Sequence, residues 1–366
     1  MHHTDQFTEI ASFTIKRRSC LNPNGELLTE RDVQPDMPRW IAIYKGMLLT
    51  RLFEQKAVRL QRTGRLGIFA TAFGQEAITV TLGHTMEKED LLCPYYRDTG
   101  ALLQRGVTMD ELLLYWGGDE RGSLFHNDSD DFPIAIMVAS QCLHAAGVAK
   151  AFQLRRQQRA VIASCGDGAT SRGDFYEALN LAGVWQLPLV FVINNNQWAI
   201  SVPLEQQTAA RTLAQKALAA EVSCEQVDGN DCMAIYYAIR EALDKARNNG
   251  GPTLIEALTY RVHEHSTADS PEYYRNDEQQ RVAKRALTLD PVRRLSRFLR
   301  SQRQWNDCLE NQWLRTCRIF IEKAVTRYLS VSADTPESIF RYNYASWPEV
   351  LVAQVAELND DDQSNA

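Results

Sequence analysis

The sequence has 366 residues, 45% of them hydrophobic, which is enough for one large core or about two smaller domains. Lys and Arg total 40 while Asp and Glu total 46, and no basic tract stands out, so neither nucleic acid nor an anionic membrane is expected as the main partner. The eight cysteines show no zinc-type spacing, no apolar run approaches the roughly 20 residues of a membrane span, and the N-terminus resembles neither a signal nor a transit peptide, so we expect a cytoplasmic protein.

The first third of the sequence alternates turn signals with helical patterns. Residues 1–38 are polar and contain Asn-Pro-Asn-Gly at 22–25, which predicts an N-terminal extension with one hairpin-like turn. Apolar residues then recur at helical spacing, and Gly64 can end the first of these helices. The expected helices span 40–62, 73–86 and 109–116, and a short apolar segment at 90–100 runs into a polar turn.

The middle of the sequence predicts strands joined by helices. The expected elements are a helix rich in small residues at 134–154, a strand at 159–165, a helix at 174–185 and a strand at 187–194. The last three form a strand–helix–strand unit, and Ser171 to Asp174 offers a capping pattern for its helix. A second such unit extends from Cys224 to about Tyr260.

This succession of elements predicts the α/β fold class. We expect a mostly parallel sheet with helices on both faces, followed by a helical C-terminal region. The expected parts are an N-terminal extension at 1–38, one domain with its helical C-terminal part at 39–330, a C-terminal segment at 331–358 and a disordered tail at 359–366.

Polar side chains follow both strands of the first unit, at the point where each strand ends. Asp167 stands between Gly166 and Gly168 after the first strand, and Asn196 lies 29 positions later, after the second. Because the carboxyl ends of neighbouring parallel strands meet at one edge of a sheet, we expect the two side chains to lie close together. A carboxylate and an amide oxygen are hard ligands that suit Mg²⁺, and the glycines let a diphosphate approach the backbone at the start of the next helix.

Each half of this pattern also has a simpler interpretation. Gly-Asp-Gly is most often a turn, and an asparagine run after a strand usually caps or turns the chain. Their pairing across one strand–helix–strand unit is what favours a metal-bridged diphosphate. The stretch has neither the G-x-G-x-x-G of a dinucleotide site nor the G-x-x-x-x-G-K-[ST] of a P-loop.

Several segments of the sequence are similar, in order, to segments of one known family. They are "GRLGIFATAFGQEA" (64–77), "YYRDTG" (95–100), "GDGATSRGDFYEALNLAGVWQLP" (166–188), "NNQWAIS" (195–201), "VDGND" (227–231) and "YRVHEHSTAD" (260–269). The sequence resembles the alpha subunit of the two-chain, thiamine diphosphate-dependent 2-oxo acid dehydrogenases, over roughly residues 12 to 350. The resemblance implies a thiamine diphosphate-binding domain at 39–330 and a subunit interface at 331–358.

The resemblance also implies a role for each matching residue. Asp167 and Asn196 would be the side-chain ligands of Mg²⁺, and the backbone carbonyl of Trp198, where relatives often have tyrosine or phenylalanine, would be a third. Tyr96 and Arg97 match the family's cofactor-binding Tyr-Arg pair, whose arginine would bind the diphosphate, and the backbone of Gly168 and Ala169 would also contact it. The backbone of Ile136 and Val138 would hold the aminopyrimidine ring, His265 would lie at the diphosphate end near the reacting centre, and Arg261 would be a loop-positioning or substrate-side residue.

Some polar residues near these motifs keep two interpretations. Either His263 or His265 could be a solvated loop residue. Gln75 and Glu76 could form an internal polar network or a subunit contact. Glu256 lies in a predicted strand and is expected to be structural, with a partner if it is buried.

The loop that contains Ser266 and Ser270 also has two interpretations. It is phosphorylated in mitochondrial relatives, and here we expect an ordinary substrate-channel loop.

The family's chemistry defines the expected activity and partners. The cofactor would attack the keto carbon of a 2-oxo acid and accept electrons as carbon dioxide leaves, and the acyl group would pass to a lipoyl arm. The carboxylic acid needed to activate the cofactor would come from a beta subunit. We therefore expect two alpha and two beta chains docked on a lipoyl-bearing acyltransferase core, with alpha alone inactive.

The substrate and two other classes of function stay open. Pyruvate is favoured over branched-chain 2-oxo acids. The chain could also be a non-catalytic scaffold subunit, or a nucleotide-binding oxidoreductase on a similar sheet.

Overall fold

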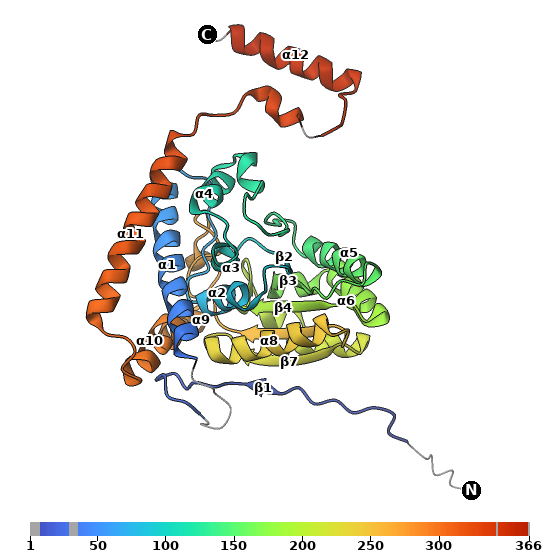
Figure 1. Cartoon of the computed structure of the whole chain (residues 1–366), viewed down its shortest axis with the longest axis vertical. Coiled ribbons are helices and arrows are strands. Elements are labelled where there is room, and N and C mark those ends of the chain that lie inside the picture. The colour runs from blue at the N-terminus through green and yellow to red at the C-terminus, as the bar shows by residue number, and fades with distance from the viewer. Residues whose placement is uncertain (1–7, 29–35, 342, 365–366) are drawn as a thin grey trace.

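A sheet of six parallel strands forms the centre of the molecule. The structure is a computed structural model that describes residues 8–28, 36–341 and 343–364 (Figure 1). The strand order is β1-β7-β8-β4-β3-β2, and every pair is parallel. The strands are β1 (Arg17–Arg18), β2 (Leu91–Cys93), β3 (Val161–Gly166), β4 (Leu189–Asn195), β7 (Ser223–Asp228) and β8 (Thr253–Leu258), and β5 (Trp198–Ala199) pairs with β6 (Val202–Pro203) in a separate antiparallel ribbon. The predicted α/β class is confirmed.

Alternate side chains of the central strands enter two separate cores, one on each face of the sheet. On β3, Val161 and Ala163 belong to one core and Ile162 to the other. On β4, Phe191 and Val192 divide in the same way. This is the period of two that a strand imposes on its side chains, and burial on both faces explains why these strands read as continuous apolar runs.

Small side chains let two helices approach one face of the sheet closely. Helices α5 (Ser140–Leu154) and α6 (Gly173–Trp185) and the 3₁₀ segment η3 (Leu213–Ala220) share a core with β3 and β4. Ala145 of α5 and Ala178 of α6 are fully buried in it. This face carries the segment between β3 and β4, and it therefore positions the loop that follows β3.

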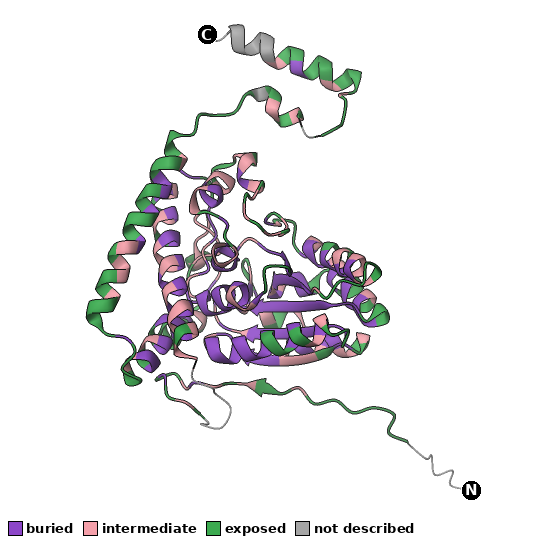
Figure 2. Cartoon of the chain, in the orientation of Figure 1, coloured by how far each residue is buried: buried purple, intermediate pink, exposed green. Residues whose placement is uncertain are grey.

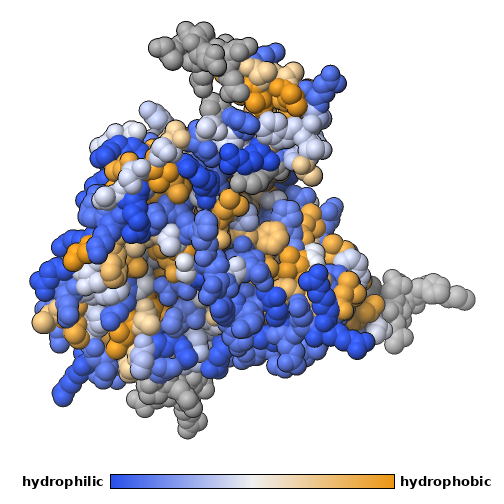
Figure 3. Space-filling view, turned by 45° about the horizontal axis from the view of Figure 1, so that its top comes forward, coloured by the Kyte–Doolittle hydropathy of each residue, from blue (hydrophilic) through white to orange (hydrophobic). Residues whose placement is uncertain are grey.

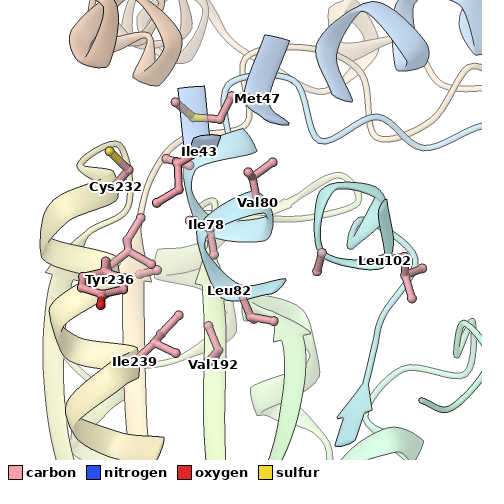
Figure 4. Close-up of a cluster of buried hydrophobic side chains, with 14 of the residues drawn as sticks. Ile43, Met47, Ile78, Val80, Leu82, Leu102, Val192, Cys232, Tyr236 and Ile239 are labelled. Carbon is pink, nitrogen blue, oxygen red and sulfur yellow. The ribbon is translucent and has the colours of Figure 1, made fainter. Parts of the chain in front are cut away.

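Larger apolar side chains fill the opposite face. Helices α1 (Met37–Arg62), α2 (Glu76–Thr85) and α8 (Cys232–Arg247) pack there. Figure 4 shows their side chains in one cluster with Val192 of β4. The arrangement confirms helices on both faces of the sheet.

The remaining helices lie around this core and toward the C-terminus. They are α3 (Thr99–Gln104), α4 (Met109–Gly117), α7 (Leu204–Gln207), α9 (Asp277–Ala286), α10 (Pro291–Ser301), α11 (Asp307–Ser330) and α12 (Glu349–Ser364). Helix α11 runs beside α1, whereas α12 stands apart from the body of the molecule (Figure 1). Figure 2 shows largely exposed residues along the described part of α12. This helix enters the segment at 359–366 that was expected to be a disordered tail.

Two predicted helices begin later than expected. The helix expected from residue 134 begins at Ser140, because Ala139 has a left-handed φ of 74° and Ala135 forms a bridge with Tyr95. The helix expected from residue 73 begins at Glu76, after Gly74 with a φ of 80°. In both cases the backbone before the helix passes beside the carboxyl edge of the sheet.

The predicted capping pattern at 171–174 does not form. Arg172 is the residue that precedes α6, and no side chain there accepts a hydrogen bond from the first turn. Ser171 is instead the last residue of the 3₁₀ turn η2 (Asp167–Ser171).

The N-terminal turn is present as predicted, since Leu21 and Leu27 form an antiparallel bridge around it.

Apolar patches interrupt a mostly hydrophilic surface on the face seen in Figure 3. Within the described ranges, no helix combines the length and the apolar character needed to cross a membrane.

Candidate active site

The two residues predicted to bind a metal line one cavity at the carboxyl edge of the sheet. Strands β3 and β4 are neighbours, with Gly166 paired to Asn194, so that Asp167 and Asn196 leave the sheet at adjacent points. Both line a cavity of about 280 Å³, and Arg97 also lines it. The predicted proximity follows directly from the parallel pairing of the two strands.

Asp167 is a buried carboxylate without a basic partner. Asp167 is only 1% exposed, and Gln207 Nε2 donates a hydrogen bond to its Oδ2 at 3.1 Å. Among the described residues, no lysine or arginine lies within ion-pairing distance of it. Burial raises the pKa of Asp167 to about 6. A cation in the cavity would stabilise the ionised form of this buried, unpaired carboxylate, so the surroundings of Asp167 fit a divalent metal ion.

Asn196 is held by an internal polar network. Its Nδ2 donates to Gln75 Oε1 at 3.3 Å, and its Oδ1 accepts from the backbone N–H of Trp198 at 3.3 Å. Gln75 is fully buried, and its Nε2 has no hydrogen-bond partner among the described residues. Of the two interpretations for Gln75, the structure supports the internal network.

The backbone after Asp167 is bare at Gly168, where it packs closely against Ala199 of β5. A Cβ atom on Gly168 would lie 2.8 Å from the Cβ of Ala199, which is closer than carbon atoms approach. Gly168 and Ala169 both line the cavity, and the N-terminus of α6 follows at Gly173. The bare backbone and the helix terminus suit a phosphate group.

Arg97 is buried and connects the segment of Thr71 to His265, which lines the cavity. Its Nη1 donates to the carbonyl oxygen of Thr71 at 2.5 Å, and its Nη2 donates to the carbonyl oxygen of His265 at 2.7 Å. The preceding Tyr96 lines the same cavity. The next residue, Asp98, accepts from the backbone N–H of Tyr95 at 3.0 Å, which fixes the turn that carries Arg97.

Of the two histidines, His265 lines the cavity and His263 does not. His263 packs its ring against Phe73, with the centroids 4.4 Å apart. Burial, Arg97 and Arg261 together lower the pKa of His265 to about 4. His265 is therefore neutral at physiological pH and can exchange hydrogen bonds with a bound molecule.

Arg261 lies behind the cavity wall. Its Nη2 donates to the carbonyl oxygen of Ile200 at 2.6 Å and to Tyr274 Oη at 2.7 Å. Its Nη1 lies 3.5 Å from the carbonyl oxygen of Trp198, the predicted third metal ligand. These contacts correspond to the loop-positioning alternative for Arg261, because they hold the segment after Asn196.

The segment before α5 reaches the cavity with Val138. Ile136 is not among the lining residues, but its neighbour Ala135 is. Ile136 and Met137 are exposed at 55% and 77%, so this part of the rim presents apolar side chains to the outside.

Two buried glutamates have structural partners. Both oxygens of Glu76 accept from Arg51, at 2.6 and 2.8 Å. Glu256 accepts from Asn195 Nδ2 at 2.7 Å and from the backbone N–H of Ala214 at 3.0 Å. The expected structural role of Glu256 is confirmed, and Glu76 belongs to an internal ion pair.

The sequence reasoning missed Gln207, which contacts Asp167, and Lys216, which lies behind η2. Both lie in "PLEQQTAARTLAQKALAA", a stretch that contains no motif of its own. Within the described ranges, no group of three His, Cys, Asp or Glu side chains could hold a metal ion, and the predicted ligand set contains just one such residue, Asp167.

Comparisons with known proteins agree with the geometry. Residues 44–337 match the family described as Dehydrogenase E1 component. The chain is 37% identical over 338 residues to "Pyruvate dehydrogenase E1 component subunit alpha" of Staphylococcus aureus, covering 91% of this chain and 90% of that protein. It is 40% identical over 307 residues to "3-methyl-2-oxobutanoate dehydrogenase subunit alpha" of Mycobacterium tuberculosis, covering 83% of this chain and 82% of that protein.

Proposed function

The chain belongs to the Dehydrogenase E1 component family, and from that premise we propose that it is the alpha subunit of a pyruvate dehydrogenase that uses thiamine diphosphate and Mg²⁺. Its reaction would be the oxidative decarboxylation of pyruvate with transfer of the acyl group to a lipoyl group. We place the protein in the cytoplasm, with a beta subunit and a lipoyl-bearing acyltransferase core as partners.

The observation that carries this proposal is the shared cavity of Asp167 and Asn196 at the ends of β3 and β4. Asp167 would supply a carboxylate oxygen to Mg²⁺, Asn196 an amide oxygen and Trp198 a backbone carbonyl. Gly168 and Ala169 would contact the diphosphate through bare backbone. When bound, the cofactor supplies the electron-accepting ring that the decarboxylation needs.

The arginine and histidine of the cavity would orient the bound molecule. Arg97 brings a fixed positive charge to the diphosphate side, together with Tyr96. Neutral His265 would hold or donate a proton near the reacting centre. Arg261 would keep the loop of Trp198 in place, and the backbone at Ile136 and Val138 would face the aminopyrimidine ring.

The composition of the cavity wall supports a second chain. In the described part of the chain, Asp167 is the sole carboxylate that lines the cavity, and no glutamate does. The acid that activates the cofactor would therefore come from the beta subunit. Exposed apolar side chains at the rim, including Met137 and Ile200, offer a surface for that partner.

A branched-chain 2-oxo acid is the second candidate substrate, because the Mycobacterium tuberculosis relative bears the name of a 3-methyl-2-oxobutanoate dehydrogenase. The test is steady-state turnover of the chain with its beta subunit, on pyruvate and on 3-methyl-2-oxobutanoate. A higher kcat/KM on pyruvate supports the first proposal, and the reverse order supports the second. Turnover by the alpha chain alone would contradict the shared site.

A further inference from the structure

Lys216 is a buried lysine whose hydrogen-bond partners are neutral. It lies in η3, and the residue is 8% exposed. Its Nζ donates to the carbonyl oxygen of Thr170 at 2.7 Å and to Thr170 Oγ1 at 3.0 Å. The ring of Tyr176 lies 5.3 Å from the same ammonium group. Within the described ranges, no carboxylate lies within ion-pairing distance of Lys216.

The partner of this lysine belongs to the wall of the candidate active site. Thr170 is part of η2, whose residues Asp167, Gly168 and Ala169 line the cavity. The Thr170 hydroxyl, which accepts from Lys216, in turn donates to the carbonyl oxygen of Asp167 at 2.7 Å. The ammonium group is thus two hydrogen bonds away from the backbone of the predicted metal ligand.

A buried charge without an ionic partner is costly, and structures keep such a charge where a nearby opposite charge compensates it. Asp167 and a bound diphosphate would together place more negative charge on the other side of η2 than one Mg²⁺ ion neutralises. In the protein interior, charges interact over longer distances than in water. Lys216 therefore lies where a positive charge would stabilise the negative charge of the bound diphosphate.

We propose that Lys216 is a positioning residue of the cofactor site, which fixes the η2 turn through Thr170 and attracts the diphosphate from behind the cavity wall. This inference rests on the proposed function, since it assumes that thiamine diphosphate binds in the cavity. It adds to the site a cation from η3, and Lys216 is not among the site residues predicted from the sequence.

The chain offers a matched control in Lys245. This half-buried lysine donates to the carbonyl oxygen of Pro252 at 2.8 Å and to Ser223 Oγ at 2.9 Å. Ser223 is the first residue of β7, so the control lies at the amino ends of the strands, whereas the cavity lies at their carboxyl ends. Lys216→Met and Lys245→Met therefore remove similar buried charges, one beside the site and one far from it.

The experiment is calorimetric titration of the full chain with its beta subunit, using thiamine diphosphate or thiamine monophosphate at saturating Mg²⁺. For Lys216→Met we expect the Kd of thiamine diphosphate to rise by roughly tenfold or more, because the attraction between the buried ammonium group and the diphosphate is lost and the η2 turn is held less firmly. The Kd of the monophosphate should rise less. Lys216→Arg should stay within about threefold of wild type, and Lys245→Met within about twofold.

Every other outcome would contradict either this inference or the proposed function. Unchanged diphosphate binding by Lys216→Met overturns the inference alone, and so do equal losses for the two ligands or an equal loss in Lys245→Met. If Lys216→Met does not fold, Lys216→Gln replaces it and must show the same selective loss relative to Lys216→Arg. If the wild-type complex does not bind thiamine diphosphate, the proposed function fails, and the inference fails with it.

Discussion

Arg97 donates hydrogen bonds to two atoms of His265, the ring nitrogen Nδ1 at 3.1 Å and the carbonyl oxygen at 2.7 Å. Because a guanidinium can only donate, Nδ1 must be the acceptor, and the ring proton of a neutral imidazole then lies on Nε2. This agrees with a pKa of His265 lowered to about 4 by burial and by two arginines. Arg97 thus fixes the position and the tautomer of His265, and it helps burial and Arg261 to keep the ring neutral.

Replacement of His265 by asparagine is expected to reduce turnover. The variant loses the proton on Nε2 that would face the reacting centre, and removal of such a group typically lowers kcat by about 10²-fold or more. The measurement is kcat of the complex with the beta subunit, with calorimetry of thiamine diphosphate as a separate readout. A kcat within about threefold of wild type would contradict a catalytic role for His265.

Arg97→Lys is expected to weaken cofactor binding although the charge is kept. A single ammonium group cannot reproduce the planar fork that joins Thr71 to His265, so the Kd of thiamine diphosphate should rise about tenfold. Arg105→Lys is the control, because Arg105 is a buried arginine paired with Asp131 away from the cavity. That variant should lose stability but keep the Kd. Equal effects of the two changes on Kd would show that Arg97 has no special role.

Gly168→Ala should disturb η2. The added methyl group would lie 2.8 Å from the Cβ of Ala199, so the turn or the β5–β6 ribbon must move. We expect at least a tenfold rise in the Kd of thiamine diphosphate, an order of magnitude that corresponds to about 1.4 kcal/mol. Gly173→Ala serves as the control, since no atom lies within 4 Å of its Cβ position. Wild-type affinity in Gly168→Ala would exclude close approach of the ligand to this backbone.

Glu54→Gln should change how stability depends on pH. Glu54 accepts from Thr71 Oγ1 at 2.7 Å, its Oε1 has no partner among the described residues, and burial raises its pKa from 4.5 to about 7. As the pH rises from 4.5 to 7, the unfolded chain releases this proton first, so the wild type loses stability over that window.

The amide of Glu54→Gln does not titrate, so the stability of the variant relative to the wild type should increase as the pH rises. Its free energy of unfolding relative to wild type should increase by up to about 3 kcal/mol between pH 5 and pH 8. Urea unfolding of the chain at a series of pH values measures this difference. A difference that stays constant with pH would mean that Glu54 is ionised in the folded protein throughout.

The sequence predicted those parts of the site that depend on local pattern. The parallel order of β3 and β4 follows from the strand–helix–strand unit, and it places Asp167 and Asn196 at one edge of the sheet. Glu256 was expected to need a partner, and Asn195 and Ala214 provide it. These results come from rules of strand geometry and buried charge that need no knowledge of distant contacts.

Contacts between distant segments were not predictable in the same way. The start of α5 depends on the left-handed backbone of Ala139, a residue that rarely adopts it and gives no sign of it in the sequence. Lys216 meets Thr170 across 46 positions, and no spacing rule connects them. Arg97 and His265 are 168 positions apart, and only the folded chain shows that one sets the tautomer of the other.

The central claim is that Asp167 and Asn196 bind one metal ion that holds a diphosphate. The most direct measurement is a crystal structure of the chain with its beta subunit, thiamine diphosphate and Mn²⁺ in place of Mg²⁺, with the metal located by anomalous scattering. The account predicts a peak at about 2.1 Å from a carboxylate oxygen of Asp167 and from Asn196 Oδ1, next to the diphosphate. Bound cofactor with its metal at other residues, or a cavity that stays empty at saturating cofactor, would contradict it.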